Sequence, residues 1–106
     1  MFRIIISMSV RTESDCTKLV DQIIRDFHLA VLSNDLRTQK FLDVIQLCDL
    51  VPDDLNLSDS VISQLHKGMC LDKMYDELKA ENCYREALDL CQKFNTGDWE
   101  PRIRES

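Results

Sequence analysis

The chain has 106 residues and a net charge of −6, and 44% of its residues are hydrophobic and 30% charged. This length suits one domain, and the composition is that of a folded globular protein rather than of a disordered one. With only two glycines and two prolines, the chain lacks the turn residues that β-sandwiches and barrels need. The glycine count also excludes a glycine-rich phosphate loop. Composition therefore predicts a small all-α domain.

The charge distribution argues against two classes of partner. The 13 basic residues are outnumbered by 19 acidic ones and form no cluster or stripe. Nucleic acids and anionic membrane surfaces both require such a cluster, so neither is expected as a partner. The longest apolar stretch, residues 2–10, is too short to span a bilayer and is followed by no clear signal-peptide cleavage site. We therefore expect a cytoplasmic protein.

The first segment, FRIIISMSV at residues 2–10, is β-branched and lacks helical periodicity. It resembles a strand, but a single strand is not stable without a partner. We therefore expect residues 1–11 to be an extended N-terminal arm, one that packs on the domain or continues into the first helix. A sheet edge supplied by a partner is a further alternative. The conformational entropy lost on ordering nine residues is about as large in free energy as the gain from burying three isoleucine side chains. The arm should therefore be stably ordered only as part of that helix or against another chain.

The next two segments are predicted helices at residues 12–33 and 35–50. Thr12 with Asp15 can form an N-terminal cap for the first, and its apolar residues recur at three- and four-residue steps. In the second, apolar residues from Leu36 to Cys48 lie mostly on one stripe. Pro52 ends this helix because the residue before a proline is disfavoured in the α conformation.

The remaining sequence predicts several shorter helices. One begins at Ser58 or Asp59 and ends at Gly68, and another is capped by Asp72. Asn82 is a possible break before a last helix that closes at Asn95–Gly97. The expected fold is a compact antiparallel bundle of five to six helices over residues 12–95, followed by a flexible polar tail at 96–106.

Catalytic and metal-binding patterns are weak. The five cysteines include no CxxC pair and fall mostly at apolar helix positions, so we interpret them as reduced core thiols. His28 and His66 lie in different helices, and neither has a partner at zinc-ligand spacing. We therefore predict no metal, no cofactor and no enzymatic activity.

One motif is more informative. In the segment DLRTQKFL, the residues Asp35, Leu36, Lys40, Phe41 and Leu42 resemble the second helix of death-effector domains. The resemblance continues through a loop with paired acids and a later amphipathic helix, and it covers about residues 16–94. Near its end, Ala87 stands where the family has arginine, Arg85 lies two residues earlier, and Asp89 keeps the acidic position.

The resemblance implies homotypic assembly of the kind found in cell-death or innate-immune signalling, without catalysis. It implies protein-interaction roles for Asp35, Lys40, Phe41, Leu42, Arg85 and Asp89. If Phe41 and Leu42 act in this way, at least part of the pair should be exposed. Burial in the core is the common alternative for Phe41. The alternatives for the whole chain are a helical adaptor or solenoid end, and a small regulatory protein that masks a partner's groove.

Overall fold

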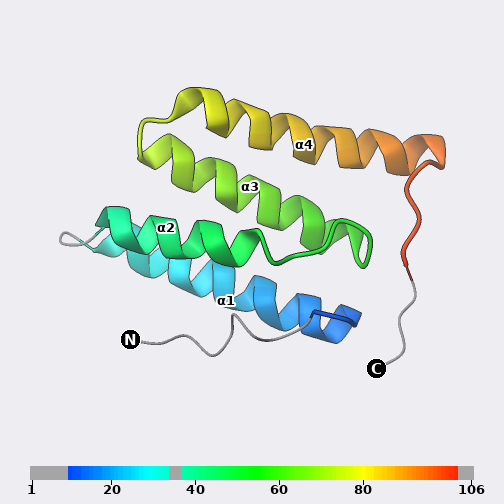
Figure 1. Ribbon diagram of the computed structural model, residues 1–106, viewed down its shortest axis with the longest axis horizontal. Coiled ribbons are helices and arrows are strands. Elements are labelled where there is room, and N and C mark those ends of the chain that lie inside the picture. The colour runs from blue at the N-terminus through cyan, green and yellow to red at the C-terminus, as the bar shows by residue number, and fades with distance from the viewer. Residues whose placement is uncertain (1–9, 34–36, 103–106) are drawn as a thin grey trace.

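The computed structural model describes residues 10–33 and 37–102, and these form an all-α protein. Within these ranges there are four helices, α1 (Glu13–Leu32), α2 (Arg37–Cys48), α3 (Leu57–Lys73) and α4 (Glu77–Thr96). The predicted helical class is confirmed, but the described residues form four helices, fewer than the five to six expected. Figure 1 shows them as two antiparallel hairpins, α1 with α2 and α3 with α4.

Helix α1 begins where its sequence predicts. The Thr12 hydroxyl accepts a hydrogen bond from the Asp15 amide at 3.1 Å, and the Asp15 carboxylate accepts one from the Thr12 amide at 3.2 Å. This reciprocal capping box satisfies amides that have no partner inside the helix. Because backbone amides donate to its charged form, the pKa of Asp15 is lowered.

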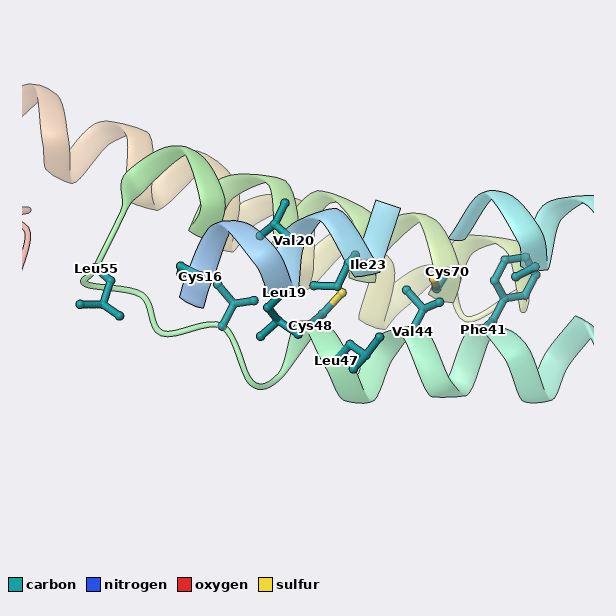
Figure 2. Close-up of a cluster of buried hydrophobic side chains, with 12 residues drawn as sticks. Cys16, Leu19, Val20, Ile23, Phe41, Val44, Leu47, Cys48, Leu55 and Cys70 are labelled. Carbon is teal, nitrogen blue, oxygen red and sulfur yellow. The ribbon is translucent and has the colours of Figure 1, made fainter. Parts of the chain in front are cut away.

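The main core lies between α1, α2 and α3 (Figure 2). The Phe41 and Val44 side chains on α2 and the Ile23 side chain on α1 are almost fully buried there, together with Cys70 of α3. Leu55, from the loop between α2 and α3, closes one end of this cluster. Val10 packs against the same core, whereas the rest of the predicted N-terminal arm, residues 1–9, lies outside the described residues.

Helix α3 does not end at Gly68, as predicted from the sequence, but continues to Lys73. The glycine has a packing role instead: a Cβ atom at this position would lie 2.5 Å from Cε1 of Tyr84. The missing side chain therefore lets the Tyr84 ring of α4 lie directly on the α3 backbone. The prediction was wrong because a glycine can serve close helix contact as well as a helix end.

The α3–α4 connection also differs from the expectation. Asp72 lies inside α3, and the cap of α4 is Asp76, which accepts a hydrogen bond from the Lys79 amide at 3.3 Å. Tyr75 adopts a left-handed conformation with φ 62°. The Asp76 amide donates to the Leu71 carbonyl at 2.9 Å and the Tyr75 amide to that of Asp72 at 3.0 Å. These bonds form a Schellman turn with tyrosine where glycine is usual.

Helix α4 is continuous through Asn82, where a break was considered possible, and it ends at Thr96. Exposed asparagine in a helix costs only a fraction of a kilocalorie, and the buried neighbours Cys83 and Ala87 pack against α3. The predicted end of the helix is confirmed, because Gly97 supplies the left-handed cap with φ 81°.

The four helices form a compact helical bundle, as predicted, and this bundle is flattened into an array. The backbone measures 43 × 31 × 17 Å along its principal axes. Helix α3 packs against α1, α2 and α4, whereas α4 packs along α3 and has no comparable approach to α1 or α2. Helix α4 is thus the edge of the array (Figure 1).

The start of the predicted flexible tail is held against the body of the protein. The Trp99 indole donates a hydrogen bond to the Asp53 carbonyl at 2.6 Å, and its ring lies 6.3 Å from that of Phe94. The Arg102 guanidinium forms an ion pair with the Asp54 carboxylate. Residues 98–102 therefore lie along the α2–α3 loop, and the only tryptophan of the chain forms one of their contacts.

Candidate interaction surfaces

The predicted residues on α2 divide between core and surface. Phe41 is only 1% exposed, and its ring centroid lies 6.0 Å from that of Phe27. Leu42, the next residue, is 40% exposed and points out of the core. A direct contact with another protein is therefore open to Leu42, whereas Phe41 acts through packing.

Lys40 lies on the side of α2 that faces α1. Its side chain is exposed and lines a shallow hollow of about 100 Å³ together with Asp26, Leu29 and Asp43. Leu29 is 59% exposed, so this hollow combines apolar and charged groups at the surface. Asp35, the first residue of the motif, lies outside the described residues.

The predicted residues on α4 lie one helical turn apart and are exposed. The Arg85 guanidinium is 3.5 Å from the Glu81 carboxylate, and Asp89 is 3.1 Å from the Lys93 ammonium. Exposed ion pairs of this kind contribute only about 0.2–1 kcal/mol to stability. Arg85 and Asp89 are therefore available to a partner at little cost to the fold.

The structure does not bring the two predicted groups together. The backbones of α2 and α4 do not approach each other closely, and α3 lies between them (Figure 1). Lys40 and Leu42 are two residues apart and point to different sides of α2, whereas Arg85 and Asp89 share one face of α4. Any contact between the two groups has to join two different molecules.

The cysteines confirm their interpretation as small core residues in four of five cases. Cys16, Cys48, Cys70 and Cys83 are buried, and Cys91 is half-buried. Burial raises the pKa of Cys16 to about 11 and that of Cys70 to about 12. Such groups remain neutral thiols at physiological pH, in which form they are poor nucleophiles and poor metal ligands.

Each histidine forms a hydrogen bond with its own helix. Nδ1 of His28 lies 2.9 Å from the Ile24 carbonyl, and Nδ1 of His66 lies 2.9 Å from that of Ile62. The His66 ring also packs edge-on against Phe27, with centroids 5.3 Å apart. Among residues 10–33 and 37–102 there is no group of three or more side chains arranged to hold a metal ion.

Two polar links between helices were missed in the sequence. Lys67 of α3 donates a hydrogen bond to Asp49, just after α2, at 2.7 Å, and this bond raises the pKa of Lys67. Thr17 of α1 donates to the Asp59 carboxylate at 3.3 Å, and burial of Asp59 raises its pKa. These pairs are 18 and 42 residues apart in sequence, so no local pattern could have identified them.

A larger hollow lies beside α1, at the end of the array where that helix begins. It has a volume of about 390 Å³ and, among the described residues, is lined by Val10, Asp15, Lys18, Leu19, Gln22, Arg25 and Leu50. Apolar groups of Val10, Leu19 and Leu50 are combined there with the cations Lys18 and Arg25. The sequence analysis did not single out this site, because its residues come from three separate segments.

Comparisons with protein-family models, curated proteins and solved structures find no match to this chain. None of the helices in the described part is long and apolar enough to cross a membrane.

Proposed function

We propose that this protein is a non-enzymatic protein–protein interaction module that assembles with further copies of itself. The observation that carries the proposal is the open edge formed by α4, whose backbone closely approaches only that of α3 among the described helices. This helix exposes Leu78 (75%), Leu88 (59%) and Phe94 (55%). Large apolar side chains on an unpartnered helix favour contact with another protein.

The separation of the predicted residues supports the same proposal. Lys40 and Leu42 on α2 and Arg85 and Asp89 on α4 lie on different surfaces. Two different surfaces that meet between identical chains form a heterologous contact, which builds rings or filaments. The resemblance of DLRTQKFL to death-effector domains agrees with this mode of homotypic assembly, in cell-death or innate-immune signalling in the cytoplasm.

The second candidate is a helical adaptor in which α4 packs against the helices of a different protein. The flat arrangement of two antiparallel hairpins favours this alternative, because α-solenoids stack helix pairs in the same way. The two candidates differ in whether the chain alone is sufficient for assembly.

Sedimentation velocity of matched variants tests the proposal. Leu42→Asp and Arg85→Glu alter exposed residues, so each should weaken self-association by about tenfold and leave helical circular dichroism and the melting temperature unchanged. Phe41→Ala is the contrasting variant, because it removes a buried ring and should lower the free energy of unfolding by about 3–5 kcal/mol. A wild-type chain that stays monomeric but joins the helices of a different protein would support the adaptor instead.

A further inference from the structure

Tyr75 combines two properties that the fold itself does not explain. Its backbone is left-handed, with φ 62°, a conformation that costs a residue with a side chain free energy that glycine would avoid. Its side chain is 91% exposed, the highest value among the large hydrophobic residues of the described chain. The backbone at Tyr75 is therefore strained. The side chain buries too little surface within its own chain to offset the free energy of that strain.

Backbone strain of this kind is concentrated at sites that bind a ligand or a partner. Tyrosine is also one of the residues that most often dominate binding energy at protein interfaces, because a large ring is ordered at little entropic cost. The two Schellman hydrogen bonds of Tyr75 and Asp76 fix the backbone of the α3–α4 turn and so the direction in which the Tyr75 side chain leaves it. It thus displays a preorganised aromatic side chain at one end of the array.

The hollow beside α1 has the properties needed to receive this ring. Its volume of about 390 Å³ lies within the roughly 300–1,000 Å³ typical of ligand pockets. Leu19 and Leu50 give it apolar contact surface, and Lys18 and Arg25 add positive charge. The carboxylate of Asp15 is the one acidic group among the described lining residues, and it accepts hydrogen bonds from the amides of Arg11 and Thr12.

Charge around the turn complements the hollow. Within four residues of Tyr75 there are three carboxylates, of Asp72, Asp76 and Glu77, and two lysines, Lys73 and Lys79. Lys79 is paired with Asp76 at 3.7 Å. The turn and the start of α1 lie at opposite ends of the array, so one molecule cannot bring its own ring into its own hollow (Figure 1).

We propose that Tyr75 of one chain inserts into the α1 hollow of a second copy, with Lys18 and Arg25 facing the acidic residues of the turn. This contact is heterologous, and it leaves one free turn and one free hollow at the ends of every assembly that does not close into a ring. It rests on the proposed self-assembly and adds a second contact to the one proposed between α2 and α4.

Sedimentation velocity of variants on each side tests this contact. Tyr75→Asn keeps a residue that tolerates the left-handed conformation but removes the ring, and it should weaken self-association by about tenfold or more. Tyr75→Phe keeps the ring and should assemble like the wild type. Lys18→Glu with Arg25→Glu should weaken assembly to the same extent as Tyr75→Asn.

Mixing the two disabled chains gives the sharpest result. The Tyr75→Asn chain keeps its hollow, and the Lys18→Glu/Arg25→Glu chain keeps its tyrosine, so one intact contact remains between them. The mixture should therefore associate more strongly than either disabled chain alone. Association in the mixture that is no stronger than that of each chain alone would overturn the assignment.

The outcomes separate this inference from the function on which it rests. If the wild type assembles and Tyr75→Asn assembles equally well, the Tyr75 contact is wrong while self-assembly stands. If the wild type is monomeric throughout, both are wrong. If deletion of residues 1–9 abolishes assembly that Tyr75→Asn leaves intact, the N-terminal segment, and not Tyr75, makes the contact.

Discussion

Single residues decide how closely these helices approach each other, and Gly68 is the clearest case. Tyr84 covers the α3 backbone at a position where a Cβ atom would lie 2.5 Å from its ring. The sequence could identify Gly68 as unusual, since it is one of two glycines in the chain. It could not show which purpose the glycine serves, because the contact with Tyr84 depends on how α4 returns along α3.

Gly68→Ala should therefore destabilise the protein. Overpacking costs about 1–3 kcal/mol, and the better helix propensity of alanine returns up to about 1 kcal/mol. Urea unfolding should show a net loss on the order of 1 kcal/mol, and the loss should disappear when Tyr84→Ala is added. A gain in stability for Gly68→Ala alone would mean that the ring does not pack there.

The buried thiols make stability sensitive to alkaline pH. Burial raises the pKa values of Cys16, Cys48 and Cys70 above the value of about 8.5 expected in the unfolded chain. The folded state therefore keeps protons that the unfolded state releases. The thiol contribution is complete below about pH 8.5 and is lost as the pH rises toward the folded pKa values.

Denaturant unfolding at a series of pH values tests this dependence. Each thiol should lower the free energy of unfolding by up to about 1.4 kcal/mol per pH unit above pH 8.5. Cys70→Ala should reduce the slope of the free energy of unfolding against pH by the contribution of one thiol. A free energy of unfolding that stays constant from pH 8 to about pH 10 would contradict the burial of these groups.

Elements differ in how far the sequence determines them. Helix α1 was predicted almost to the residue, because its capping box and its apolar stripe agree. The sequence after Leu57 predicted more helices than the structure has, because Gly68, Asp72 and Asn82 each resemble the end or the start of a helix. At Gly68 the contact with Tyr84 decides against the local signal, and a contact of that kind is not visible in one segment alone.

Helix α4 should be the least stable of the four helices. The main core cluster draws its buried residues from α1, α2, α3 and the loop after α2, and it contains none from α4. A smaller cluster of Leu71, Ala80 and Cys83 holds α4, with Ile45 reaching it from α2. Fewer buried contacts lower the free energy of local opening.

Native-state hydrogen exchange tests this ranking at conditions where the protein is monomeric. Amides at Ala87–Leu90 of α4 should open with a free energy on the order of 2 kcal/mol below that of amides at Val20–Ile24 of α1. Equal protection of both helices would show that α4 is an integral part of one cooperative unit.

At the scale of the whole molecule, the flat array explains why the surface positions of the proposed interaction residues could be only partly predicted from sequence. The motif on α2 identified a real surface residue in Leu42, whereas its neighbour Phe41 is in the core. The strained display of Tyr75 carries no sequence signal, because tyrosine is not expected in a left-handed turn. The hollow beside α1 emerges only when three segments fold together.

Sedimentation velocity of the 106-residue chain shows directly whether the protein associates with itself. Over the micromolar concentration range, we predict that the weight-average mass rises with concentration well above the 12.4 kDa of one chain. A single 12.4 kDa species at every concentration would contradict it.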